Sequence, residues 1–187
     1  MTKFFKFLLL FFFCQLSTSN LLTEEKKFWI NDDQIKLVNE VIEILEEDHY
    51  TKKNYSSIKE DIVVSFIDRL DPSRSIFLEK EVNSFTSDFL NLQQNNQREA
   101  VDRALRIFDL YYLRYLKRYE LQKELLTNIE GLNLNQNKKI LKDRSESRRE
   151  DSLEALNILW KDQLINDVIQ LYLTGNNRNE TKSKLIK

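Results

Sequence analysis

The chain has 187 residues, of which 41% are hydrophobic and 32% are charged, so it can bury a core of its own. Its 29 basic and 30 acidic side chains give a formal net charge of −1, which provides no general attraction to nucleic acid or acidic lipid. Only two glycines and one proline are present, whereas a strand-and-turn architecture needs such residues about every 8–12 positions. Composition and periodicity therefore predict an all-α protein, an irregular bundle of about five to six helices.

The first twenty residues have a composition of their own. Lys3 and Lys6 precede an apolar run over residues 7–13, and small polar residues follow, with Ser17 and Ser19 spaced as in a cleavage site. This order is typical of a secretory signal peptide, and the apolar run is short for a membrane span. An uncleaved membrane anchor is the alternative.

We therefore expect a signal peptide over residues 1–19 and a helical domain over residues 20–187. The only cysteine, Cys14, lies in the apolar run, so the mature chain would contain no cysteine and no disulfide. The product is expected to be exported, in a bacterium to the periplasm, and to meet the membrane only transiently through its signal peptide.

Apolar residues at three- and four-residue spacing predict the helices. The first begins at Asp32 or Asp33. The second begins at Ser57, since Glu60 three residues later has the spacing of a capping box, and it ends near Arg69. The apolar face of the first helix consists of Ile35, Val38, Ile42, Leu45 and His49.

The only proline of the chain lies directly after the second helix. Residues 71–74 are predicted to form a type I turn, with the side chain of Asp71 as an acceptor and Pro72 at the second position. A third helix is expected over about residues 79–94. The apolar residues between turn and helix should pack back beneath the helix pair: Ile76, Phe77 and Leu78.

The second half of the chain is predicted to contain three more helices. A long one covers about residues 98–128, and a fifth covers residues 151–173, after a polar linker over residues 129–150 that we expect at the surface. Gly175 has the position of a left-handed C-cap, and a last helix begins at about Asn179. The apolar side of the long helix is expected to be Leu105, Phe108, Tyr112, Tyr115, Leu116 and Tyr119.

Residue patterns for catalysis or metal binding are scarce. Glu46 and His49 form a Glu-x-x-His pair, but di-iron bundles need that unit twice and the chain has one histidine, so a structural role is favoured. No Gly-x-Ser-x-Gly, Cys-x-x-Cys or glycine-rich phosphate loop is present, although counting alone leaves a Ser–Lys pair open. We expect no catalytic, cofactor-binding or metal-binding residue and no cofactor.

Aromatic and basic residues alternate in the long helix, as they do on surfaces that bind single-stranded nucleic acid. The aromatic residues fall on one side at helical spacing, and the charges fall mostly on the other. This is typical of an ordinary amphipathic helix, so we expect no nucleic-acid partner. The basic residues concerned are Arg106, Arg114, Lys117 and Arg118.

A succession of motifs resembles a known family. After His49-Tyr50 come "FIDRLDPSRSIFLEKEVNSF", then "DLYYLRYLKRYE", "EALNILWKDQLINDVIQLYLTG" and "KSKLIK". Over essentially all of residues 35–187 the chain is similar to the N-terminal helical region of the tail-specific proteases, or C-terminal processing peptidases, of the bacterial periplasm. The linker keeps Asp143-Arg144 but lacks a Trp-Pro pair expected before the fifth helix, so its path is not predicted.

The resemblance implies a function. Full-length members continue into a PDZ domain and a serine protease domain with a Ser–Lys dyad, and they cleave proteins selected by apolar C-terminal tails. Their N-terminal helical region helps frame the substrate cavity and can carry adaptor contacts. We expect the PDZ domain and the dyad to be missing from this chain, so no catalytic residue is transferred. We expect a non-catalytic domain, present as a truncated or split-gene product.

The implied partners are the protease and PDZ domains of the same family, if these are made separately, and a periplasmic adaptor protein or substrate. The alternative hypothesis is a free-standing periplasmic helical binding module, which would dock on a protease, an adaptor or the envelope.

Overall fold

A computed structural model describes most of the chain: residues 30–48, 55–93, 96–135 and 138–186. The predicted signal peptide, with Cys14, and the single histidine, His49, lie outside the described residues.

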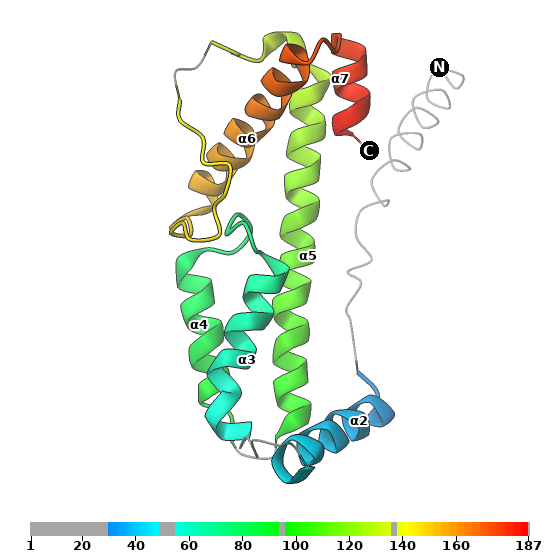
Figure 1. Ribbon diagram of the computed structural model, residues 1–187, viewed down its shortest axis with the longest axis vertical. Coiled ribbons are helices and arrows are strands. Elements are labelled where there is room, and N and C mark those ends of the chain that lie inside the picture. The colour runs from blue at the N-terminus through cyan, green and yellow to red at the C-terminus, as the bar shows by residue number, and fades with distance from the viewer. Residues whose placement is uncertain (1–29, 49–54, 94–95, 136–137, 187) are drawn as a thin grey trace, which may run out of the picture.

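The described residues form α-helices and contain no strand, which confirms the all-α class. A π-helical stretch, Ile44–Asp48, continues the first helix, and a short 3-10 turn, Ile129–Gly131, follows the longest one. The α-helices, with the labels of Figure 1, are α2 (Asp32–Glu43), α3 (Tyr55–Leu70), α4 (Glu79–Leu90), α5 (Gln97–Thr127), α6 (Leu153–Leu173) and α7 (Arg178–Leu185).

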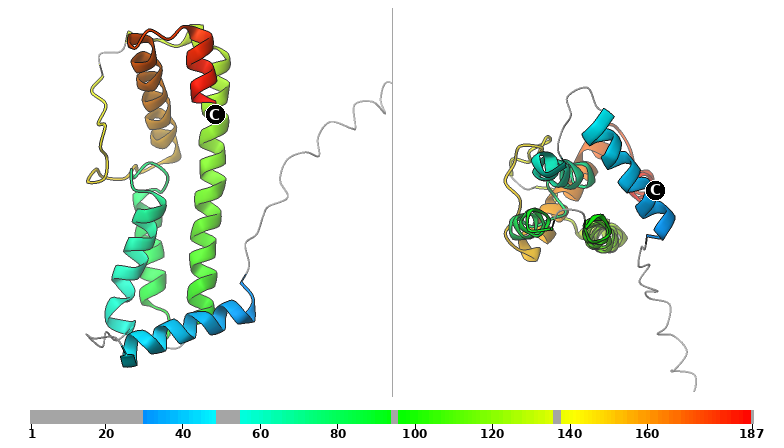
Figure 2. Two further views of the ribbon diagram at one scale, coloured as in Figure 1. Left: turned by 45° about the vertical axis from the view of Figure 1, so that its right-hand side comes forward. Right: turned by 90° about the horizontal axis from the view of Figure 1, so that it is seen from below.

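Helix α5 runs the length of the molecule, and the other helices are distributed along it (Figures 1 and 2). Helices α3 and α4 pair with each other and lie against its first half, whereas α6 and α7 lie beside its second half. Helix α2 crosses its lower end. Among the described residues, no helix has both the length and the apolar character needed to cross a membrane.

Polar side chains begin several helices where the sequence offers an acceptor oxygen. Asn31 and Asn177 form capping boxes with Gln34 and Glu180, and Ser152 accepts the N–H of Ala155 at 3.1 Å. The predicted cap at Ser57 is wrong. Helix α3 already begins at Tyr55, which places Ser57 inside its first turn.

The predicted C-cap of α6 is confirmed. Gly175 has φ +85°, a conformation that is strained for residues with a Cβ atom. Its N–H donates to the carbonyl of Tyr172 at 3.0 Å, and the N–H of Asn176 donates to that of Leu171 at 3.1 Å. This pair of bonds is a Schellman motif, which satisfies the last carbonyls of the helix and turns the chain toward α7.

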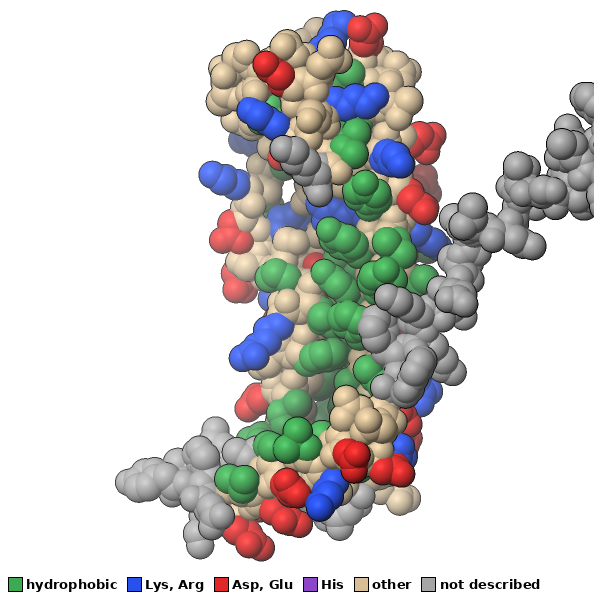
Figure 3. All heavy atoms as spheres, turned by 90° about the vertical axis from the view of Figure 1, so that its right-hand side faces the viewer, with side chains coloured by type: hydrophobic (Ala, Val, Ile, Leu, Met, Phe, Trp, Pro, Cys, Tyr) green, Lys and Arg blue, Asp and Glu red, His purple; other side chains and the backbone are tan. Residues whose placement is uncertain are grey.

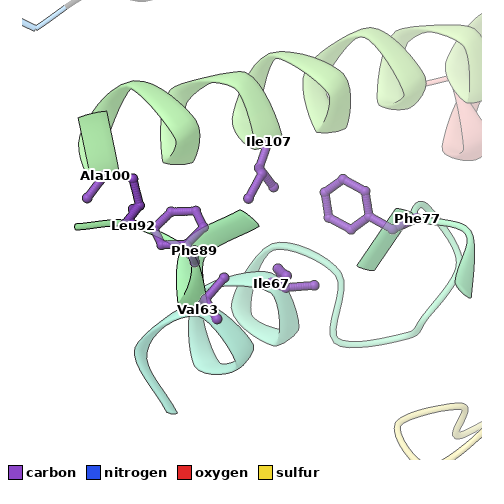
Figure 4. Close-up of a cluster of buried hydrophobic side chains, with 7 residues drawn as sticks. All are labelled: Val63, Ile67, Phe77, Phe89, Leu92, Ala100 and Ile107. Atoms are coloured by element: carbon purple, nitrogen blue, oxygen red, sulfur yellow. The ribbon is translucent and has the colours of Figure 1, made fainter. Parts of the chain in front are cut away.

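Two main hydrophobic clusters lie at the two ends of α5, and a small third one lies between them. The first joins α3, α4 and α5 (Figure 4) and comprises Val63, Ile67, Phe77, Phe89, Leu92, Ala100 and Ile107. The second joins α5, the 3-10 turn and α6, with α7 packed against it, and is built on Leu126, Ile129, Leu164 and Val168. The third consists of Leu78, Leu156 and Trp160.

The predicted packing face of α5 is wrong. The residues that enter the first cluster, or pack on it, are Ala100, Ala104, Ile107, Leu110 and Tyr111, and Arg114 is buried on the same side. On the predicted side Tyr115 and Tyr119 are exposed, and the others are only half-buried. The true face is not evident from the sequence, because alanine or arginine occupies three of its positions.

The linker over residues 129–150 is only partly the surface segment that we expected. Its first residue, Ile129, is buried in the second cluster, and Arg149 near its end is also buried. The linker is therefore anchored to the helices at both ends.

Phe77 offers the sharpest test of the first cluster. Its side chain is fully buried and meets Phe85 edge-on, with ring centroids 5.7 Å apart. We expect Phe77→Ala to lower the free energy of unfolding by about 3–5 kcal/mol, because it removes a buried ring and leaves a cavity. Urea unfolding followed by circular dichroism measures this. Leu173→Ala, at a highly exposed position of α6, is the control and should change little; equal losses in both variants would contradict the packing.

Candidate functional site

The residues that the sequence singled out for metal binding do not assemble into a site in the described part of the chain. Glu46 lies exposed on the π-helical stretch, and its companion His49 lies outside the described residues. No group of three His, Cys, Asp or Glu side chains within the described residues is close enough to hold a metal ion.

The corner loop, residues 71–78, instead forms the polar centre of the molecule. The Asp71 carboxylate accepts the backbone N–H groups of Ser75 at 2.8 Å, Ile76 at 3.0 Å and Phe77 at 3.1 Å. The turn closes through the N–H of Arg74, which donates to the Asp71 carbonyl at 3.1 Å. The predicted role of Asp71 as a side-chain acceptor is thus confirmed, and one carboxylate orders the whole loop.

Arg149 neutralises this carboxylate. Its guanidinium pairs with Asp71 through Nη1, and through Nη2 it also reaches the half-exposed Asp68 at 3.2 Å. The Asp71 side chain is 0% exposed and that of Arg149 is 5% exposed. Because an isolated buried charge is very costly, each of these two ions depends on the other.

Two further contacts fasten the linker to the corner loop. Arg74, which has a left-handed φ of 48°, donates to the carbonyl of Ser147 at 3.1 Å. The N–H of Glu79, at the start of α4, donates to the carbonyl of Glu150 at 3.1 Å. The end of the linker therefore follows the corner loop closely.

Helices α5 and α6 bind the other side of the corner loop. The indole N–H of Trp160 donates to the Ser75 carbonyl at 2.6 Å. Arg114 donates to the Ile76 carbonyl at 2.9 Å and forms a bidentate pair with Glu81, at 2.5 and 2.8 Å. The loop thus connects α3 and α4 to both α5 and α6.

The charges around the loop alter the titration of Glu81. Partial burial acts to raise its pKa, but hydrogen bonds from Arg114 and from the Leu78 N–H outweigh burial, so the pKa lies below the ordinary 4.5. Glu81 is therefore held as a carboxylate, which suits an ion pair that supports structure.

Most members of this arrangement are not evident from the sequence. Asp71 was found from its place before the proline, whereas Arg114, Arg149 and Trp160 are 33 to 85 residues from the groups they bind. A charge within an apolar stretch of α5 was the only local signal for Arg114. The polar groups of the corner loop are hydrogen-bonded and neutralised by other residues of the same chain. We therefore assign this arrangement the role of positioning the helices.

An aromatic stripe on α5 is the second candidate feature. It consists of Val101, Leu105, Phe108, Tyr112, Tyr115 and Tyr119, which follow one another at three- and four-residue spacing. In Figure 3 hydrophobic side chains form a band along this side of the molecule toward α2. On α2 itself Leu37 and Val41 are 60% and 49% exposed.

Stacked rings connect the stripe to the core. Tyr115 stacks on Tyr111 with ring centroids 6.1 Å apart, and Tyr111 in turn meets the buried Phe77 at 6.2 Å. Burial raises the pKa of Tyr111, and the nearby Tyr115 and Asp71 add to the effect. Tyr115 of the stripe is therefore connected through Tyr111 to Phe77 of the corner loop.

The family of the chain follows from its sequence over this whole region. Residues 41–187 match the family described as the tail specific protease N-terminal domain. The chain belongs to this family. No curated protein matches the chain.

The tail-specific protease N-terminal domain contains both candidate features. The matched residues include the corner loop, the aromatic stripe, the linker and the helices from α3 onward, while most of α2 precedes them. The match thus confirms the resemblance carried by the motifs. The family description names the N-terminal domain of the protease, and in this chain the described residues of that domain form helices without a strand.

The Asp71–Arg149 pair predicts strong energetic coupling. We expect Asp71→Asn and Arg149→Met each to lower the free energy of unfolding by about 3–5 kcal/mol, because each leaves the other ion buried without its partner. The double variant should lose clearly less than the sum, as measured by urea unfolding in a double-mutant cycle.

Arg148→Met is the matched control for this cycle. Arg148 is the neighbouring residue and pairs with Asp151 at 3.1 Å, but both side chains are largely exposed. Its removal should cost about 0–1 kcal/mol. Additive losses from Asp71→Asn and Arg149→Met would show that the buried pair is not a coupled unit.

Glu81 predicts a dependence on pH. A carboxylate whose pKa is lowered by folding stabilises the protein above its ordinary pKa, and this stability is lost as the pH falls through the lowered value. The difference in unfolding free energy between the protein and Glu81→Gln should therefore be largest near neutral pH and shrink below the ordinary pKa of 4.5. Urea unfolding from about pH 7 to about pH 3 tests this; a difference that grows toward acid would contradict the assignment.

Proposed function

We propose that this chain is the non-catalytic helical domain of an exported tail-specific protease, which frames the substrate and carries contacts to the protease and PDZ domains. The observation that supports it is the family match over residues 41–187, within which α5 exposes Tyr115 and Tyr119 of the aromatic stripe. Hydrophobic patches of this kind mark protein-binding sites.

The corner loop gives the domain the stiffness that a frame requires. It ties α3, α4 and α6 to α5 through buried polar contacts, of which the Trp160 to Ser75 and Arg114 to Ile76 bonds are examples. Because Tyr115 of the stripe stacks on Tyr111, a docking partner meets a side chain that is already ordered. Pre-ordered surfaces bind with a smaller entropic cost.

Export to the periplasm is part of the proposal and is supported by the sequence pattern of residues 1–19. An adaptor protein or the substrate itself would be further partners at the same surface. Nothing in this role requires a catalytic side chain on the chain itself.

The function is tested by mixing residues 20–187 with the PDZ–protease region of a tail-specific protease. We expect the chain alone to leave a peptide with an apolar C-terminus intact, and to bind the PDZ–protease region in isothermal titration calorimetry. Tyr115→Ser together with Tyr119→Ser should weaken this binding about tenfold or more, because exposed aromatic anchors carry much of the energy of an interface.

Two exposed residues of α6, changed as Ile158→Ser and Leu173→Ser, form the matched control. They remove a comparable apolar area outside the stripe and should leave the affinity unchanged. Equal weakening by both pairs would overturn the role of the stripe. Cleavage of the peptide by the chain alone, abolished by one serine substitution, would overturn the proposed function.

A further inference from the structure

A cavity of about 550 Å³ lies between α6 and the linker, on the linker side of the corner loop. Figure 1 shows the linker passing alongside α6 in this region. The lining combines two basic groups, one carboxylate, three amides, a hydroxyl and two apolar side chains: Arg118, Lys142, Asp167, Gln163, Asn166, Gln170, Ser73, Ile140 and Leu141.

Arg118 is the distinctive group of the cavity. It donates from Nη1 to the Ser75 hydroxyl and from Nη2 to the Gln163 side-chain oxygen, both at 3.1 Å. Both acceptors are neutral, and none of the ion pairs among the described residues includes Arg118. A guanidinium has five N–H donors, so the two bonds leave three donors for another acceptor.

The balance of charge around the cavity is positive. Arg118 and Lys142 face a single carboxylate, Asp167. Burial lowers the pKa of Arg118, and burial raises the pKa of Asp167, so both groups are partly removed from water. An anion that enters the cavity would meet a partly desolvated guanidinium, where charge-assisted hydrogen bonds are strong.

We propose that this cavity binds a small organic carboxylate with an apolar group. The guanidinium of Arg118 receives the carboxylate, and Ile140 and Leu141 contact the hydrocarbon part. The amides of Asn166 and Gln170 remain for polar groups of the ligand. The single negative charge of a carboxylate matches the one excess positive charge of the cavity. A phosphate carries a charge of about −1.5 to −2 and has no hydrocarbon group that could contact the apolar lining.

The ligand class is tested by titrating the isotope-labelled chain with three probes and following amide NMR shifts. The probes are N-acetylleucine, its uncharged amide N-acetylleucinamide, and inorganic phosphate. We expect N-acetylleucine to shift the amides of residues 140–142 and 163–170, with the amide probe bound about tenfold more weakly or worse. Equal binding of acid and amide, tighter binding of phosphate, or the absence of shifts at these residues would overturn the proposal.

Substitutions locate the carboxylate. Arg118→Met should weaken the binding of N-acetylleucine about tenfold or more, since the substitution removes the charged donors. Asp167→Asn should tighten the binding of N-acetylleucine severalfold, because the substitution removes the competing negative charge and keeps the side-chain shape. Arg148→Gln is the control, because Arg148 lies on the same linker but pairs with Asp151 outside the cavity. This substitution should not change the affinity for N-acetylleucine.

Arg118 also holds Ser75 and Gln163, so its substitution could disturb the fold. Lys142→Gln avoids this problem, because Lys142 is an exposed residue of the lining. It should weaken the binding of N-acetylleucine severalfold and leave the melting temperature unchanged. Unchanged affinity in both Lys142→Gln and Asp167→Asn would overturn the proposal. These measurements use no protease, so their outcome is independent of the function proposed above.

Discussion

A carboxylate without access to water is the constraint on which the rest of this structure depends. Asp71 can be buried only because three backbone N–H groups and Arg149 satisfy it. That requirement brings the end of the linker onto the corner loop, and the linker in turn fixes where α6 begins. The loop then receives Trp160 from α6 and Arg114 from α5. The angle between α3 and α4 is thus set by contacts to distant parts of the chain and not by Pro72 alone.

Helix α5 divides its surface between two tasks. One side closes the first hydrophobic cluster and supplies Arg114 to the corner loop, and the adjacent side carries the aromatic stripe. Tyr111 lies where the two sides meet, between Phe77 in the core and Tyr115 at the surface. A partner on the stripe would therefore touch residues one ring away from the loop that organises the helices. The cavity beneath the linker is bordered by Arg118 of the same helix, so α5 contributes to both features that we propose as binding sites.

Local sequence predicted the helices well, and for physical reasons. Some signals act through neighbours in the chain: the periodic apolar residues, the Asp71–Pro72 turn and Gly175. The helix bounds predicted from these signals agree with the structure within a few residues. The packing face of α5 was predicted wrongly because a helix with two apolar sides gives no single direction. Arg149 could not be found at all, since its importance comes from an acid 78 residues away, and the surrounding linker has no periodicity. No site residue had been predicted, and the residues now proposed around Arg118 come together only through the path of the linker.

The separation of these partners has a consequence for the order in which the protein can fold. When the ribosome has made α3 and α4, the acid at the corner still lacks its arginine, and Ser75 still lacks the indole that follows 85 residues later. Until then the carboxylate must stay hydrated, and the two helices can be no more than loosely associated. The first half of the chain should therefore remain in an open, unfolding-prone form until the last third has been synthesised. For the export that we propose, such delayed closure would keep the chain unfolded enough to pass through a translocon.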